Sequence, residues 1–388
     1  MTTQTPPIRV GLIGLSASAA TAWAANAHLP YLLSPTGRSR YTITALLNSS
    51  TSAAERAVAA YNLHPSQIKT YGDPAALAAD PSVDLVVCNT RVDTHFDTVL
   101  PSVKAGKDVF VEWPLAHDTH HARVLAEEIK KAGGRGIVGL QGGAAPVAAK
   151  LRQLLEEGRI GKVLSSELRV FGGTNDRAEL PDKLAYFAER KYGGNIVAIG
   201  VMHTLHLVQS VLGDLASAKA DLHLQRPEIP IRDTSSNTIT RTIQSEIPDL
   251  ILVSGRWDES SITQKNATLH YRTRRGQPFS GEPALQWTIH GEKGEIRIVS
   301  RDMGFIHVGN PSARVIEIHD FATNTVDKVE WDWEKWQQEL PVPARNIGSL
   351  YEAFVEAKKS GTPPRYVTFD DAVRRHEQLD GLFADWKP

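Results

Sequence analysis

The sequence is poor in cysteine: Cys88 is the single one among 388 residues. One cysteine excludes an intramolecular disulfide and a cysteine-rich zinc site, and this agrees with a reducing compartment. The three residues before it, Leu85, Val86 and Val87, are apolar. This pattern predicts an inert residue on a buried strand rather than a nucleophile.

The sequence also lacks an excess of charge of either sign and any long apolar run. Its 43 basic and 44 acidic side chains leave a net charge of -1, which does not favour direct binding to nucleic acid or to an anionic membrane. No stretch reaches the roughly 18 apolar residues of a spanning helix. The first ten residues, MTTQTPPIRV, lack the basic and apolar regions of a secretory signal. We expect a cytoplasmic protein, with access to the nucleus left open.

What is present is a chain long enough for two domains. A single hydrophobic core rarely organises 388 residues. The content of 41% apolar and 22% charged residues is ordinary for a globular protein. We expect one domain over residues 1–145 and a second over 146–388, which begins with a helix leading out of the first.

The periodicity differs between the two halves. Short apolar runs alternate with helical patterns up to residue 140, which predicts a parallel sheet with crossover helices. Alternating strands then predict a mostly antiparallel sheet. The expected strands are 9–13, 42–47, 85–88, 108–111, 136–140, 218–224, 250–257, 267–271, 285–290 and 295–299. The expected helices are 52–61, 94–104, 120–131, 146–157, 196–212, 347–359 and 370–383.

The predicted fold class is therefore α/β. A doubly wound Rossmann domain is followed by an α+β domain with a large, open, mostly antiparallel sheet. The last helix is left free to return to the first domain.

A small-residue turn follows the first expected strand. The dinucleotide fingerprint G-x-G-x-x-G takes the form G-x-S-x-x-A here, with Gly14, Leu15, Ser16 and Ala19. Gly14 suits a tight turn, Ser16 lets the backbone approach a diphosphate, and Ala19 permits close packing of a helix whose N-terminus attracts anions. The alternative is a strand-to-helix turn that binds no ligand.

The end of the second strand carries Asn48 and Ser49, where an NAD-specific protein usually has an acid for the ribose hydroxyl. Neutral side chains leave room for a 2'-phosphate, and Arg56 on the next helix could approach it. NADP is therefore favoured over NAD, with both kept open. A solvated surface arginine explains Arg56 equally well.

A polar loop follows the strand that ends at Cys88. Asn89 and Thr90 occupy the position expected beside a nicotinamide ribose, and His95 begins the next helix. His95 either faces the cofactor or has a capping or surface role.

Several motifs, spread over nearly the whole chain, are typical of one protein family. They are Val10-Gly11-Leu12-Ile13-Gly14, Asn89-Thr90, His95, Glu112-Trp113-Pro114, Tyr192-Gly193-Gly194 ahead of His203, and His290-Gly291-Glu292-Lys293-Gly294-Glu295-Ile296. Together they resemble the Gfo/Idh/MocA oxidoreductases. Trp23, His28 and Gln141-Gly142 are most similar to the branch of the fungal galactose-pathway repressor, a cofactor-binding regulator. The resemblance implies NAD or NADP, a small-molecule substrate, and a homodimer or homotetramer.

Two residues of the family's usual catalytic set are replaced. The family's lysine corresponds to Trp113, which carries no charge, and its aspartate corresponds to Ile199, which cannot titrate. His203 remains, and a near-neutral pKa would suit a general acid or base. The expected catalytic residues are His203, Tyr192 and Glu112.

The resemblance also implies a nucleotide site and a substrate pocket. The cofactor-binding set is Gly14, Leu15, Ser16, Ala19, Asn48, Ser49, Asn89, Thr90, His95, Glu112 and Trp113. The pocket set is Trp113, Tyr186, Ile199, His203 and His206. Trp113 is expected to form an apolar wall near the nicotinamide. His203 and His206 lack a third ligand of suitable spacing, so no metal is expected, and His120 and His121 are expected at the surface.

Two functions are consistent with this pattern. The first, which we favour, is an NAD(P)-dependent oxidoreductase with a rebuilt site that acts on a small carbonyl, imine, enone or hydroxyl compound such as a secondary metabolite. The second is a catalytically silent NAD(P)-binding regulator with a protein partner, because loss of two members of a catalytic unit usually removes most of the activity.

Overall fold

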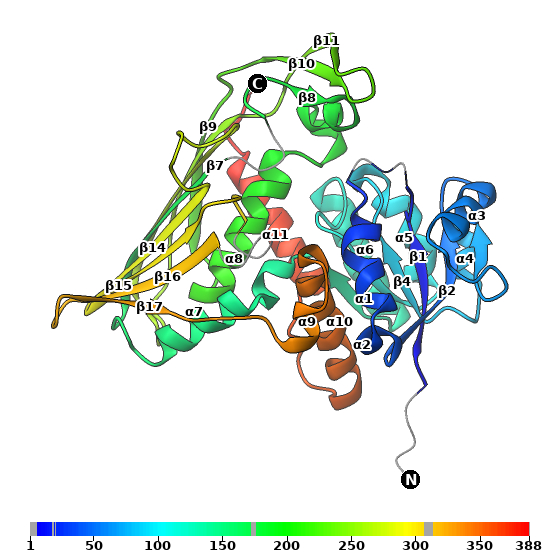
Figure 1. Cartoon of the computed structure of the whole chain (residues 1–388), viewed down its shortest axis with the longest axis horizontal. Coiled ribbons are helices and arrows are strands. Elements are labelled where there is room, and N and C mark those ends of the chain that lie inside the picture. The colour runs from blue at the N-terminus through cyan, green and yellow to red at the C-terminus, as the bar shows by residue number, and fades with distance from the viewer. Residues whose placement is uncertain (1–5, 18, 20, 172–175, 306–312, 388) are drawn as a thin grey trace. The chain divides into compact units, whose positions relative to one another are not determined.

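The computed structural model describes residues 6–17, 19, 21–171, 176–305 and 313–387. The chain forms two compact units (Figure 1). The first consists of Met1–Gln141 and Glu334–His376, and the second of Gly142–Trp333 and Glu377–Pro388. The expected boundary at residue 145 lies close to this division. Residues 334–376, which were expected in the second domain, instead belong to the first unit.

The first unit is built on six parallel strands in the order β3-β2-β1-β4-β5-β6. They are β1 (Ile8–Ile13), β2 (Tyr41–Leu47), β3 (Lys69–Tyr71), β4 (Leu85–Cys88), β5 (Asp108–Val111) and β6 (Gly136–Val138). Sequence periodicity missed β3, which is three residues long and begins with an exposed lysine. The strand order reverses between β1 and β4, which is where sheets of this kind bind ligands.

Helices cover this sheet. They are α1 (Leu29–Leu33), α2 (Pro35–Arg38), α3 (Thr51–Ala60), α4 (Pro74–Ala78), α5 (His95–Lys104), α6 (Thr119–Ala132), α9 (Lys335–Gln338) and α10 (Val342–Ser360), and α11 (Phe369–Leu382) belongs to this unit up to His376. Because helices lie against both faces of a parallel sheet, its central strands are largely apolar: β4 is apolar throughout, and β5 is apolar after Asp108.

Aromatic packing holds α10 in the first unit. Tyr351 of α10 is fully buried and stacks on Tyr31, with ring centroids 5.0 Å apart and planes 11° apart. The Tyr41 hydroxyl donates a hydrogen bond of 2.7 Å to the Tyr351 carbonyl. Farther along, the Val138 amide of the edge strand β6 donates to the Val367 carbonyl at 2.8 Å. These contacts bury large rings and cover a sheet edge, which explains why this late segment returns to the first unit.

The second unit contains α7 (Pro146–Glu156), α8 (Met202–Leu212) and the rest of α11. Its main sheet has the order β17-β16-β15-β14-β7-β13-β12-β9, in which β7 and β13 form the one parallel pair. Its strands are β7 (Val163–Phe171), β9 (Ser217–His223), β12 (Leu250–Arg256), β13 (Thr263–Arg274), β14 (Leu285–Gly291), β15 (Gly294–Ser300), β16 (Arg314–Asp320) and β17 (Thr325–Val329). The predicted fold class is thus confirmed.

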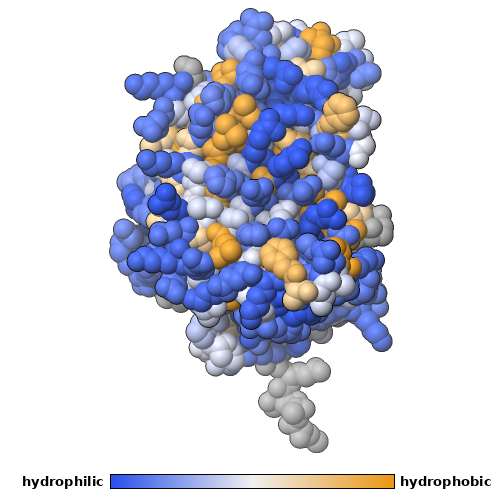
Figure 2. Space-filling view, turned by 90° about the vertical axis from the view of Figure 1, so that its left-hand side faces the viewer, coloured by the Kyte–Doolittle hydropathy of each residue, from blue (hydrophilic) through white to orange (hydrophobic). Residues whose placement is uncertain are grey.

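One face of this sheet is apolar and the other is polar. Trp287, Ile289 and Ile298 are fully buried, whereas Glu167, Arg169 and other alternate residues are exposed. On the side shown in Figure 2, hydrophilic residues predominate and apolar ones form small separate groups. A smaller sheet has the order β11-β10-β8, with β8 (Leu180–Pro181), β10 (Glu228–Asp233) and β11 (Thr238–Gln244). Among the described residues, no helix has both the length and the apolar character needed to cross a membrane.

Candidate functional site

The turn after β1 brings the chain close to the end of β4. Gly14 has a φ of +86°, and a Cβ atom there would lie 3.1 Å from backbone atoms of Asn89. The Gly14 amide also donates to the Leu47 carbonyl of β2 at 3.1 Å. A side chain at this position would be both strained and crowded, so the turn requires glycine. This is the tight turn predicted from the sequence.

The helix predicted directly after this turn begins later. The first helical residues are Trp23 and the π-helical turn η1 (Ala24–His28), and Ala22 before them has a left-handed φ of +47°. Ala19 therefore lies in a loop, and the prediction that it packs within a helix is wrong. Residues 16–22 are alanine, serine and threonine only. They have no large apolar side chain that would hold an early helical turn on the sheet.

Asn48 supports this loop. Its side-chain amide donates to the Leu15 carbonyl at 2.9 Å and to the Ala53 carbonyl at 3.4 Å. Ser49 beside it is exposed, and Arg56 is exposed on α3. The Asn48 amide thus joins the loop after β1 to the start of α3. Asn48 and Ser49, at the position where an NAD-specific protein usually has an acid for the ribose hydroxyl, are both neutral.

Asn89 carries an unusual side chain. Its Nδ2 and Oδ1 atoms are both buried, and neither has a hydrogen-bond partner in the described part of the chain. Buried polar atoms are almost always paired, because an unpaired one loses its bonds to water without replacement. Asn89 follows β4 at the switch point and lies against Gly14. This carboxamide therefore fits a ligand that offers both a donor and an acceptor.

His95 has a structural position. It is 1% exposed, and its Nδ1 and Nε2 lie 2.9 Å from the Pro114 carbonyl and 3.0 Å from the Thr90 carbonyl. Burial lowers the pKa of His95, so the ring is neutral near pH 7 and donates to one carbonyl at a time. The expected alternatives of a capping or surface role are wrong, since the ring joins the loop after β4 to the loop after β5.

Glu112 is held by a chain of buried hydrogen bonds. Its Oε1 lies 2.8 Å from His28 Nε2, and His28 Nδ1 lies 2.9 Å from the Tyr351 hydroxyl. A carboxylate only accepts, so Nε2 carries the proton, and Nδ1 of a neutral ring accepts from Tyr351. Burial raises the pKa of Tyr351 well above its usual value, which keeps this hydroxyl a donor. Glu112 is thereby fixed at the end of β5, over Gly139.

Trp113 packs on a histidine that the sequence analysis did not select. The indole is 4% exposed, and its ring lies 4.8 Å from that of His376 on α11. His376 is 2% exposed, and its Nε2 has no partner among the described residues. Burial lowers the pKa of His376 to about 4. Trp113 thus has a neutral aromatic neighbour.

The remaining candidates lie in the second unit. Asn195 caps a π-helical turn, η6 (Ile196–Val201), by accepting from the amides of Val197 and Ala198 at 3.0 and 2.9 Å. The next residues form α8 and carry His203, which is 9% exposed. Burial lowers the pKa of His203 to about 4. The pKa is thus lower than the near-neutral value expected, and the ring is neutral near pH 7.

Near His203 in the sequence, the structure brings two tyrosines together. The rings of Tyr186 and Tyr192 meet edge to face, with centroids 6.0 Å apart. Ile199 on η6 is half-buried and His206 on α8 is 8% exposed. A Cβ atom at Gly143 would lie 3.0 Å from His206 Nε2, so this ring lies against the chain that enters the second unit.

The two buried histidines predict a pH-dependent stability. His203 and His376 both have folded pKa values of about 4, below the unfolded value of about 6.5. Between these values the unfolded chain binds protons that the folded chain excludes, so the free energy of unfolding falls as the pH drops through this window. We expect a slope of up to about 1.4 kcal/mol per pH unit for each histidine. Urea unfolding between about pH 7 and pH 4 measures it.

His376→Leu should flatten this slope, whereas substitution of the exposed His64 should leave it unchanged. Equal slopes for the wild type and His376→Leu would show that His376 titrates normally.

The predicted site residues thus fall into two groups, one in each unit. In the first, Gly14, Asn89 and Thr90 meet at the switch point, whereas Ala19 lies in a loop and His95 joins two loops. Tyr351 and His376 were not predicted as site residues because each lies far along the chain from its partner. In the sequence, an aromatic residue or a histidine on the apolar face of a helix indicates only a position in the hydrophobic core.

Each of the two units contains a stretch that matches a known protein family. Residues 8–140 match the model of the oxidoreductase family with the NAD-binding Rossmann fold, and residues 146–300 match the model of the Gal80p C-terminal domain. The chain is 28% identical to the dehydrogenase aclE of Aspergillus oryzae, over 97% of this chain and 95% of that protein.

Two further relatives are regulators by name. The chain is 26% identical to the galactose/lactose metabolism regulatory protein GAL80 of Saccharomyces cerevisiae, over 78% of this chain and 69% of that one. The crystal structure of a super-repressor mutant of Gal80p from the same organism has a TM-score of 0.83 at 23% identity, and the match covers 98% of this chain and 95% of that one. Residues 8–140 therefore form a domain of the Gfo/Idh/MocA oxidoreductase type, and residues 146–300 form a domain of the Gal80p C-terminal type.

Proposed function

We propose that the chain is an NAD(P)-dependent oxidoreductase that acts on a small carbonyl, imine, enone or hydroxyl compound. The observation that carries this proposal is the buried Asn89 carboxamide, which has no partner among the described residues. It stands at the β1/β4 switch point beside the Gly14 turn. A nucleotide in that crevice would supply the missing donor and acceptor. The dehydrogenase relative over nearly the full chain supports the same proposal.

The residues of the first unit fit such a nucleotide. The backbone of Leu15 and Ser16 would hold the diphosphate, Asn89 the nicotinamide ribose, and Trp113 would form an apolar wall. NADP is proposed over NAD because Asn48 and Ser49 bring no negative charge toward a 2'-phosphate. When bound, the nucleotide supplies or accepts the hydride.

Proton transfer is assigned to Glu112 in this proposal. Its Oε1 lies 2.8 Å from His28 Nε2, and its Oε2 lies beside Gly139. Trp113 cannot take the place of the family's lysine as a proton carrier. An oriented carboxylate could accept a proton from a substrate hydroxyl, or return it in the reverse reaction. The catalytic roles of His203 and Tyr192, which the family resemblance implies, stay predictions.

A second candidate function is a cofactor-binding regulator with a protein partner. The observations that favour it are the replacements at Trp113 and Ile199 and the match to the Gal80p C-terminal domain. Such a protein would bind the nucleotide through the same crevice without turnover.

One experiment separates the two. The full chain is titrated with NADH and NADPH by calorimetry, and carbonyl, imine and enone compounds are then screened for loss of the reduced-nicotinamide absorbance. We expect binding of at least one nucleotide and its consumption with part of the panel. Tight binding with no turnover would support the regulator. Failure of both nucleotides to bind would exclude both functions.

Asn89→Leu gives a sharper test of the crevice. The substitution removes two unpaired buried polar atoms, so the free energy of unfolding of the ligand-free protein should stay equal or rise by up to about 1 kcal/mol. The same change should weaken nucleotide binding about tenfold, which corresponds to about 1.4 kcal/mol. Urea unfolding and calorimetry measure the two effects. A destabilised protein with unchanged affinity would show that Asn89 is a structural residue.

A further inference from the structure

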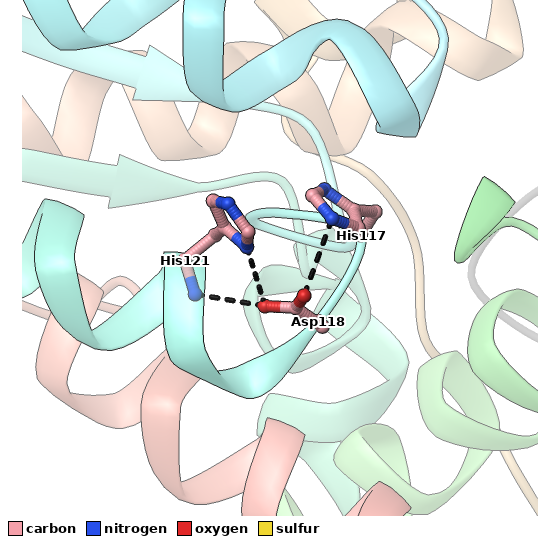
Figure 3. Close-up of side chains that lie close together, drawn as sticks. All are labelled: His117, Asp118 and His121. Atoms are coloured by element: carbon pink, nitrogen blue, oxygen red, sulfur yellow. Dashed lines mark hydrogen bonds and ion pairs between the residues drawn. The ribbon is translucent and has the colours of Figure 1, made fainter. Parts of the chain in front are cut away.

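Two histidines converge on one carboxylate between β5 and α6. Asp118 Oδ1 lies 2.7 Å from His121 Nδ1, and Asp118 Oδ2 lies 3.2 Å from His117 Nε2. The imidazole centroids are 4.3 Å apart. Figure 3 shows the two rings on either side of the carboxylate, one from the loop and one from the first turn of α6. Three donor atoms, one from each residue, lie within 4.8 Å of one another.

Helix capping explains only part of this arrangement. Asp118 is the N-cap of α6 and accepts from the His121 amide at 2.8 Å. That bond needs neither imidazole. The His117 Nδ1 is buried and has no partner among the described residues, so Asp118 is the polar group toward which this ring is turned. His121 was expected at the surface, but its ring packs edge to face on Phe96 at 4.5 Å, while His120 is exposed.

The donor types narrow the class of ligand. Two imidazole nitrogens and one carboxylate oxygen form a set that suits zinc and neighbouring transition metals, whereas magnesium and calcium prefer oxygen alone. Donors around a tetrahedral zinc lie about 3.3 Å apart, given bond lengths of about 2.0 to 2.1 Å. The observed spacings of 2.7 and 3.2 Å need only small side-chain rotations to match. The three side chains are 29%, 46% and 30% exposed, so an aqueous ion can reach them.

We propose that His117, Asp118 and His121 form a site for a divalent transition metal, with zinc as the best match. Burial raises the pKa of Asp118, but the hydrogen bonds from the His121 amide and ring lower it more, so its pKa lies below the usual value. A metal would replace the protons that the imidazoles now share with it. The site begins four residues after Trp113, so a bound ion would fix the loop that carries Trp113 and Pro114. This inference does not depend on the proposed oxidoreductase activity.

The test uses the full chain without a histidine tag, stripped with EDTA and dialysed. Zinc chloride is titrated by calorimetry and in competition with a chromogenic chelator. His117→Gln and His121→Gln should each weaken binding by at least about tenfold, the lower end of the loss when even a supporting residue is removed. Asp118→Asn should do the same while keeping a good helix cap. His120→Gln, a neighbouring exposed histidine, is the matched control.

We expect one equivalent of zinc, unchanged in His120→Gln and weakened in the three site variants. Circular dichroism of each variant shows that it is folded. The proposal fails if the wild type takes up no stoichiometric zinc, or if the site variants bind as tightly as the wild type. An equal loss in His120→Gln would indicate nonspecific binding by surface histidines and would also overturn it.

Discussion

Glu112→Gln is expected to lower turnover by about a hundredfold or more, which is within the range for removal of a positioned acid-base group. The amide keeps the shape of the side chain but cannot accept a substrate proton. Nucleotide affinity should change little, because the phosphate and ribose contacts proposed for Gly14, Ser16 and Asn89 remain. Steady-state kinetics with a substrate from the screen, together with calorimetry, measure the two effects.

Glu352→Gln is the matched control for this substitution. Glu352 is another acid of the first unit, and it accepts from the Tyr31 hydroxyl at 2.6 Å. Its replacement should leave turnover unchanged. If Glu112→Gln retains wild-type turnover, then Glu112 is a structural partner of His28 and the acid-base group lies elsewhere.

His203→Ala should also reduce turnover by about a hundredfold or more. The role of His203 is tested by the pH dependence of kcat/KM. Protonation of His203 removes the lone pair of a base, and burial lowers its pKa to about 4. In the wild type, kcat/KM should therefore stay high as the pH falls through 6.5 and decline only near pH 4. His203→Ala should lose this acid limb.

The exposed His223 on β9 offers a control, since His223→Ala should change neither the rate nor the profile. An acid limb near pH 6.5 in the wild type would contradict the buried, neutral state of His203. An unchanged profile in His203→Ala would remove this residue from the reaction.

Local pattern was enough to predict most of the parallel sheet. Apolar runs such as 85–88 and 109–111 are diagnostic because both faces of each strand are covered. The strand β3 was missed because its three residues, two of them polar, are too few to show the two-residue alternation of a strand. Several strands of the large sheet were missed as well, among them β7, although its exposed Glu167 and Arg169 alternate with buried residues as in other strands of this sheet.

The candidate site was predictable only where it follows a strand end. Gly14 and Asn89 stand directly after β1 and β4, so position alone identified them. The helix after Gly14 was placed too early because the fingerprint was assumed to keep its usual spacing. The bonds between Glu112, His28 and Tyr351 join residues up to 323 positions apart. The local sequence pattern does not predict contacts between residues so far apart. Nor does it predict a pKa lowered by burial, as at His203, because burial depends on tertiary packing.

The return of residues 334–376 has a consequence for biosynthesis. The ribosome releases the parallel sheet of the first unit first. Tyr351 and Val367, which complete its aromatic cluster and cover its edge, are synthesised only after the whole large sheet of the second unit. Until then Tyr31, Tyr41 and Phe110 lack the partner that buries them. The nascent chain must therefore carry an incomplete, partly apolar surface through most of its translation, which makes it a natural client for chaperones.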